Sequence, residues 1–271
     1  MPSRFRTIEL SDPRFEFDNL RWVTVKSPAL GQRADLTLFH PPSIHESRDV
    51  PIVILLHGVY GSHWAWALKG GAHRTAARMI QAGELPPLIV AMPSDGLWGD
   101  GSGYVPHAGP DFDRWIVEDV PAAVRESVPA AGERSPVFIS GLSMGGFGAL
   151  RLAAKHPEKF RAAGGHSSMT HFDQHRQFVE EPLESFACPT EDRSVLETML
   201  RNRDRLPPVR FDCGTEDPLL DYNRELSAGL KSVGIDHCYE EFPGGHEWPY
   251  WEKHLEDMLR FFGRVLSGGP A

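Results

Sequence analysis

The segment FISGLSMGGFGALRLAAKHP (residues 138–157) decides the fold. A short apolar run ends in Gly141-Leu142-Ser143-Met144-Gly145, and a helical pattern follows at once and stops before Pro157. Glycines at such a junction let a strand and a helix approach closely, and a serine in so tight a turn takes a strained backbone conformation. The segment therefore predicts a strand–turn–helix unit that leaves Ser143 exposed at the start of the helix.

Short apolar runs that predict strands lie on both sides of this unit. The runs 52–56, 88–92 and 137–140 are uniformly apolar, which is typical of strands covered on both faces. Residues 20–27 and 34–39, joined by a turn at Gly31, predict an antiparallel pair. Two further strands are expected, at 208–213 and 237–242.

Helical patterns alternate with the strands. They cover residues 64–82, 111–129, 144–156, 193–204, 221–233 and 250–266, and Pro121 should kink or split the second. Alternating strands and helices predict an α/β fold: a mostly parallel central sheet with the antiparallel N-terminal pair and helices on both faces. We expect a single domain over residues 1–271, with weak periodicity at 167–192 indicating an inserted cap.

Composition excludes several classes of protein. With 41% hydrophobic and 24% charged residues, and no apolar run of about 18, the chain reads as a globular protein without a membrane span. A net charge of −9 argues against general nucleic-acid binding. The N-terminus has no apolar signal segment, and three cysteines without metal-like spacing fit reduced thiols, so a cytoplasmic location is expected.

The strand–turn–helix setting makes Ser143 a candidate nucleophile, which needs a base and an acid to orient that base. In this kind of site the chain order is serine, acid, histidine. Asp217 follows the strand that ends near Cys213, and His246 follows the next strand in the same way. Because the carboxyl ends of parallel strands meet at one sheet edge, these three side chains are expected to lie together.

Other residues compete for these roles. Asp212 is expected inside its strand and Asp221 inside the next helix, while Glu216 directly precedes Asp217. Among the histidines after the acid, His237 begins a strand and His254 lies deep in the final helix. Asp217 and His246 are therefore preferred.

A glycine-bearing loop, His57-Gly58-Val59-Tyr60-Gly61-Ser62, follows the apolar strand 52–56. Its backbone can aim the N–H of Val59 at a carbonyl oxygen, together with the N–H of Met144, to form an oxyanion hole. His57 precedes the serine in the chain, so we expect it to tie the loop down.

Aromatic residues near these loops suggest a binding pocket for a small ester. Gly58, Tyr60, Trp64, Trp98 and Trp248 are the candidate substrate-binding residues, and core packing is the alternative role for Trp64 and Trp98. The loop DGLWGDGSG (95–103) lacks the closing Glu of a calcium loop and the setting of a dinucleotide site. No metal and no cofactor are expected.

Four motifs carry a resemblance to a known family. HGVYGSHWAW (57–66), GLSMGGFGALRLAAKHP (141–157), GTEDPLL (214–220) and PGGHEWPYW (243–251) resemble the putative-esterase family of α/β-hydrolases, over roughly residues 20–266. The family includes S-formylglutathione hydrolases, feruloyl and tributyrin esterases and mycolyltransferases. The resemblance implies Ser143, Asp217 and His246 as the catalytic triad, and Val59 with Met144 as the oxyanion hole.

The expected function is that of a serine carboxylesterase for small or aromatic acyl esters, acting through a covalent acyl-enzyme. An acyltransferase using the same acyl-enzyme remains an alternative, as does an S-formylglutathione-type thioesterase or a non-catalytic binding module. Tyr60-Gly61 stands where the S-formylglutathione branch usually has Thr-Cys, which argues against that activity. The natural ester, a monomeric or homodimeric state and any lid movement of residues 167–192 stay open.

Overall fold

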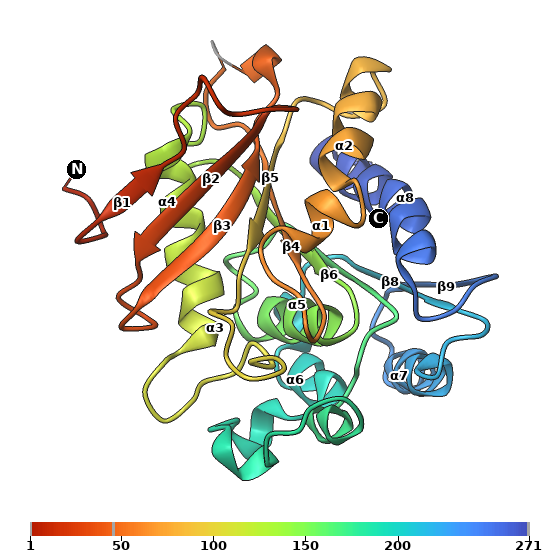
Figure 1. Cartoon of the computed structure of the whole chain (residues 1–271). Helices are drawn as coiled ribbons and strands as arrows, with labels where there is room; N and C mark the ends of the chain where they lie inside the picture. Colours follow the sequence, from red (N-terminus) through yellow and green to blue (C-terminus); the bar gives the residue numbers. More distant parts are fainter. Residues whose placement is uncertain (1, 45–46, 270–271) are drawn as a thin grey trace.

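The computed structural model describes residues 2–44 and 47–269. In this part of the chain one nine-stranded sheet forms the centre of the molecule (Figure 1). In spatial order its strands are β1 (Ile8–Leu10), β2 (Leu20–Lys26), β3 (Arg33–Phe39), β5 (Ile89–Pro93), β4 (Ile52–Leu56), β6 (Val137–Gly141), β7 (Ala162–His166), β8 (Val209–Gly214) and β9 (Cys238–Phe242). Strands β1 to β3 are antiparallel, β3 is also antiparallel to β5, and the strands from β5 to β9 are parallel.

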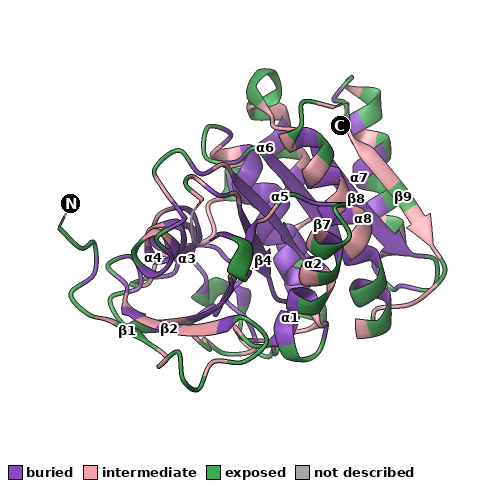
Figure 2. Ribbon diagram, turned by 90° about the horizontal axis from the view of Figure 1, so that it is seen from above, coloured by how far each residue is buried: buried purple, intermediate pink, exposed green. Residues whose placement is uncertain are grey.

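Helices cover both faces of the inner strands of the sheet, which are apolar on both sides. In β4, Ile52, Ile54 and Leu56 belong to one core and Val53 and Leu55 to the other. The first core is covered by α3 (Phe112–Arg114), a π-helical turn (Trp115–Asp119), α4 (Val120–Ser127), α5 (Met144–Lys155), α6 (Val195–Arg201) and α7 (Leu220–Ser232). The second is covered by α1 (Ala65–Leu68), α2 (Ala72–Gln81) and α8 (Trp248–Leu266). Figure 2 shows the inner strands buried and β9 only partly buried at the sheet edge.

Short 3₁₀ helices complete the structure. They are η1 (Pro42–Ile44), η3 (Phe172–Gln177), η4 (Leu183–Ser185), η5 (Thr190–Asp192) and η6 (Arg203–Arg205). No helix in residues 2–44 and 47–269 is long and apolar enough to cross a bilayer.

The predicted fold class is confirmed, with two local corrections, at residues 64–82 and at strands β1 and β7. The helix expected over 64–82 is two helices, because the chain turns at Gly70-Gly71, where Gly71 has φ +59°. The expected kink or split of the helix over 111–129 is found: a π-helical turn divides it, and Pro121 lies in the first turn of α4. Strands β1 and β7 were not expected.

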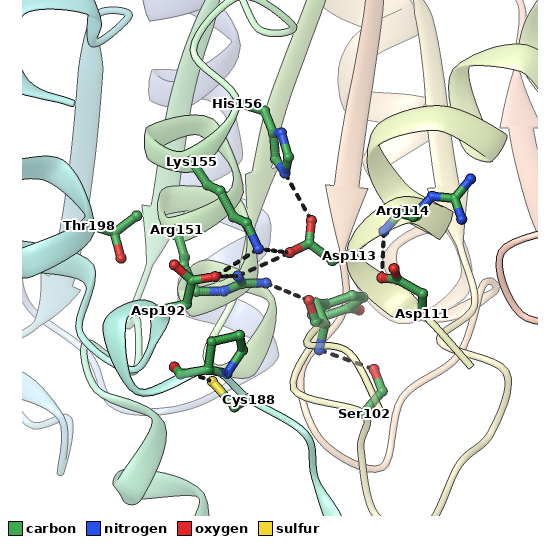
Figure 3. A network of polar contacts seen from close by, with 12 residues as sticks. Ser102, Asp111, Asp113, Arg114, Arg151, Lys155, His156, Cys188, Asp192 and Thr198 are labelled. Carbon is green, nitrogen blue, oxygen red and sulfur yellow. Dashed lines mark hydrogen bonds and ion pairs between the residues drawn. The ribbon is translucent and has the colours of Figure 1, made fainter. Parts of the chain in front are cut away.

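A buried ion network joins the helix that follows Ser143 to its surroundings (Figure 3). Arg151 of α5 is fully buried; its guanidinium lies 3.3 Å from Asp113 of α3 and donates to the carbonyl of Tyr104 at 2.6 Å. Lys155 reaches both Asp113, at 2.8 Å, and Asp192 at the end of the 167–192 segment, at 2.7 Å. Burial alone would raise the pKa of Asp113, but the charges of Arg151 and Lys155 and the His156 hydrogen bond hold it well below its usual range.

Replacing Arg151 with methionine should lower the free energy of unfolding by about 3–5 kcal/mol, because Asp113 then keeps a buried charge with less compensation. Urea denaturation at neutral pH measures the change. The control is Arg134→Met, which removes an ion pair with Asp49. The Arg134 side chain is 86% exposed, so this substitution should lower the free energy of unfolding by less than about 1 kcal/mol. Equal losses in the two variants would contradict a stabilising role for the network.

Candidate active site

The turn after β6 holds Ser143 in a strained conformation, with φ 54° and ψ −118°. Its backbone N–H donates to the carbonyl of His166 at the end of β7, at 2.9 Å. Two glycines make the turn fit: a Cβ on Gly141 would come within 2.4 Å of the Gly145 backbone, and one on Gly145 within 2.3 Å of the Leu56 carbonyl oxygen. The packing of β4, β6 and α5 therefore fixes where the Ser143 hydroxyl points.

His246 and Asp217 reach this hydroxyl from loops at the same sheet edge. The Nε2 of His246 lies 3.0 Å from Ser143 Oγ, and its Nδ1 lies 2.9 Å from Asp217 Oδ2. The other carboxylate oxygen of Asp217 accepts the backbone N–H of Leu219 at 2.8 Å. Serine, histidine and aspartate thus form one hydrogen-bonded chain.

The carboxyl group of Asp217 is buried, with 5% of the residue exposed. Burial alone would raise its pKa, but the hydrogen bond and charge of His246, with the N–H of Leu219, lower the pKa below the ordinary value. Asp217 therefore stays ionised at neutral pH and can hold His246 with Nδ1 protonated.

The competing residues have other places. Asp212 lies inside β8 and contacts His166 at 3.0 Å, Arg210 at 2.6 Å and the Tyr250 hydroxyl at 3.0 Å. Asp221 is on α7, with its side chain 86% exposed. Among the residues that competed for the acid role, the structure brings Asp217 to His246.

The loop after β4 lies against the nucleophile. A Cβ on Gly58 would come within 3.3 Å of the Ser143 Cβ and 2.7 Å of Leu142 Cδ1, so the loop passes close to the nucleophile at this glycine. Within the described residues, the backbone N–H groups of Val59 and Met144 donate to no protein acceptor. By contrast, the N–H of Tyr60 donates a hydrogen bond to the Asp100 carbonyl at 2.7 Å. Val59, in the loop that lines the cavity with Ser143, and Met144, the residue after Ser143, thus have free donors.

His57 holds this loop in place. Its ring Nδ1 lies 2.7 Å from the Gly58 carbonyl oxygen and its Nε2 lies 3.6 Å from Asp95 Oδ1. The Tyr104 hydroxyl donates to the His57 carbonyl at 3.0 Å. These contacts favour a structural role for His57.

A cavity of about 420 Å³ opens above Ser143. Its apolar walls are Val59, Trp64, Leu142, Phe178, Trp248 and Trp251. Ser143 is only 1% exposed, so the expectation of an exposed serine is wrong; these walls cover it. Of the residues expected to bind substrate, Gly58, Tyr60, Trp64 and Trp248 line the cavity.

Trp98 is not brought to this cavity. Its ring packs edge-on against His107, with centroids 4.3 Å apart, and against Phe186 at 4.8 Å. It is partly buried against the core, which matches the packing role that the sequence left open. In the described part of the chain, no group of three or more His, Cys, Asp or Glu residues could hold a metal ion.

The 167–192 segment contributes one wall of the cavity. Phe178 stacks on His246 with ring centroids 6.2 Å apart, while the Trp251 ring is perpendicular to His246 with centroids 5.0 Å apart. The Tyr60 hydroxyl donates to the Phe178 carbonyl, and the N–H of Glu180 donates to the Asp100 carboxylate at 2.9 Å. Sequence reasoning missed Phe178 as a cavity residue; its only signal was its place in the expected cap. Trp251 packs in the second core and also lines the cavity.

His175, in the same segment, makes the stability of the folded protein depend on pH. Burial lowers the pKa of His175 from 6.5 to about 4, although the Phe172 carbonyl partly opposes this. The unfolded chain therefore binds a proton that the folded chain does not, and stability is lost as pH falls from 6.5 to about 4. At about 1.4 kcal/mol per pKa unit this loss is about 3–4 kcal/mol.

His175→Phe should remove the loss of stability that comes from protonating His175. The measurement is the free energy of unfolding by urea denaturation between pH 6.5 and about 4. His171→Phe, in the same segment but with a side chain that is 42% exposed, is the comparison and should change the slope less than His175→Phe does. A His175→Phe slope equal to that of wild type would show that His175 is not the titrating group.

Known proteins are similar to this chain in sequence and architecture. The family model described as "Putative esterase" matches residues 27–262. An acetyl esterase of Caldicellulosiruptor saccharolyticus is 27% identical over 240 residues, which cover 81% of this chain and 86% of that protein. An S-formylglutathione hydrolase of Paracoccus denitrificans is 26% identical over 268 residues, with 89% and 92% covered. A solved ferulic acid esterase superposes with a TM-score of 0.78 at 25% identity, covering 91% of this chain and 98% of that one.

Proposed function

Since the chain belongs to the putative-esterase family and is a serine hydrolase with the α/β-hydrolase fold, we propose that it hydrolyses small or aromatic acyl esters through Ser143, His246 and Asp217. The observation that carries this proposal is the continuous hydrogen-bonded chain from Ser143 Oγ to His246, at 3.0 Å, and on to Asp217, at 2.9 Å. Ser143 and His246 line the cavity.

Acylation is the first half of the proposed reaction. His246 Nε2 takes the hydroxyl proton while Ser143 Oγ attacks the ester carbonyl carbon. The negative charge that forms on the carbonyl oxygen is stabilised by the free N–H groups of Val59 and Met144. His246 then gives its proton to the leaving alcohol, and an acyl group stays on Ser143.

Deacylation repeats the same steps with water. His246 takes a proton from water, the hydroxide attacks the acyl carbonyl, and the proton returns to Ser143 Oγ as the acid leaves. Throughout both halves the ionised Asp217 stabilises the positively charged imidazole.

The cavity supports a limited substrate size. Its volume of about 420 Å³ lies in the range of small-molecule sites, and the indole rings of Trp64, Trp248 and Trp251 suit an apolar or aromatic group. The acetyl esterase takes its name from a small acyl group and the ferulic acid esterase from an aromatic one.

The test is kcat/KM on p-nitrophenyl esters from acetate to decanoate, with methyl ferulate and S-formylglutathione included. We expect turnover of short or aromatic acyl esters, little on S-formylglutathione, and one phosphonate adduct on the peptide that holds Ser143. Added alcohol separates the alternatives, since ester product exceeding acid would indicate an acyltransferase. A folded protein that turns over none of these esters and takes up no phosphonate would overturn the proposal.

A further inference from the structure

Two charged side chains line the cavity above Ser143, Lys69 and Glu247. Neither forms an ion pair or a side-chain hydrogen bond within the described residues. Both residues are exposed at the cavity rim, and the Lys69 ammonium has no carboxylate partner there among the described residues, at a site that has to accept a ligand. The proposed reaction at Ser143 uses neither charge.

The position of Lys69 is fixed by its backbone. Its N–H donates to the carbonyl of Ala65 at 2.9 Å, where α1 ends. A Cβ on the next residue, Gly70, would come within 2.8 Å of the Trp248 ring, so the chain passes directly against this indole. The absence of a side chain at Gly70 therefore brings Lys69 to the cavity wall.

Trp248 also holds the ammonium group. Lys69 Nζ lies 5.5 Å from the centroid of the Trp248 ring. A cation over an indole face is attracted without being neutralised, because the ring has a quadrupole and no net charge. The ammonium keeps its positive charge and its N–H donors for a ligand in the cavity.

We propose that Lys69 binds a carboxylate carried by the substrate, which makes the preferred substrates esters with an acidic group in the acyl or the alcohol part. This inference rests on the proposed esterase function. The apolar rings of Trp64 and Trp248 contact the part between the ester and the carboxylate. Glu247 acts in the opposite sense, since its negative charge disfavours an anionic ligand.

Two pairs of esters that differ by one charge test the proposal on both sides of the ester bond. The acyl pair is mono-p-nitrophenyl glutarate against p-nitrophenyl pentanoate, and the alcohol pair is 4-acetoxybenzoate against its methyl ester. The measured quantity is the ratio of kcat/KM for the charged to the neutral ester. Taking a ratio removes effects on Ser143 and His246 that the two esters share.

In at least one pair, Lys69→Met should lower this ratio by about 3–10-fold, as expected for one partly exposed charge contact. Lys69→Arg should restore most of it, and Glu247→Gln should raise it. The control Lys159→Met, an exposed lysine outside the cavity, should leave both ratios unchanged. Raising the salt concentration to about 0.5 M should reduce the wild-type ratio.

Ratios that Lys69→Met leaves unchanged in both pairs would overturn the proposal, and so would an equal fall in Lys159→Met. If wild-type protein hydrolyses none of the four esters, the esterase function itself has failed. If it hydrolyses the neutral esters and Lys69→Met does not change the ratios, only the proposed carboxylate specificity has failed.

Discussion

Ser143→Ala is expected to lower kcat by about 10⁴-fold or more on the best ester found, while the protein stays folded. Alanine removes only Oγ, so no acyl-enzyme can form. Residual rate above that of water would come from the free N–H groups of Val59 and Met144 and from substrate binding. The strained backbone at φ 54° is the same for serine and alanine, so little change in stability is expected.

Steady-state kinetics and urea denaturation of the same preparation check this result. Ser140→Ala is the matched control, because Ser140 lies three positions earlier in β6, is fully buried and has a hydroxyl without a hydrogen-bond partner among the described residues. Its kcat should stay within about twofold of wild type. A folded Ser143→Ala protein with a near-wild-type kcat would place the nucleophile elsewhere.

The sequence predicted the elements that have a strong local pattern. The buried parallel strands are continuous apolar runs, and the turn at Ser143 is recognisable because Gly141 and Gly145 sit where a Cβ would meet backbone atoms. Asp217 and His246 could be predicted because each follows a strand whose carboxyl end faces the same edge.

Strand β7 could not be predicted because its sequence, AAGGH, has almost no side chains to form a pattern. The structure gives the reason: a Cβ on Gly164 would come within 2.2 Å of Met258 Sδ in α8, and one on Gly165 within 2.3 Å of Ser168 Oγ. The need for glycine at these positions comes from contacts with residues outside the strand. The local sequence therefore carries no signal of it.

The cavity walls were harder to predict than the triad for a similar reason. Phe178 comes from a segment of 3₁₀ helices without periodic pattern, and Tyr60 and Asp100 fix its place from distant loops. Trp98 follows a strand of the same edge, yet its ring turns to His107. Position after a strand predicts which loop lies at the site but not which way a side chain points.

Asp217→Asn is expected to lower kcat by about 10³–10⁴-fold near neutral pH. The amide has nearly the same size, so the loop and the Leu219 N–H contact can persist, but the negative charge is lost. The imidazolium that forms when His246 takes the Ser143 proton then has no ionised partner at 2.9 Å. An amide NH₂ turned toward Nδ1 would also favour the tautomer with Nε2 protonated, which cannot accept the serine proton.

Asp221→Asn is the matched control for this substitution. Asp221 lies four residues away on α7 with its carboxylate 86% exposed, so kcat should stay within about twofold of wild type. Because kcat is measured at saturating substrate, a defect in the triad lowers kcat more than it raises KM, whereas a disturbed cavity wall would raise KM. A folded Asp217→Asn protein within about tenfold of the wild-type kcat would mean that His246 is oriented by its contacts with Phe178 and Trp251 and not by the carboxylate.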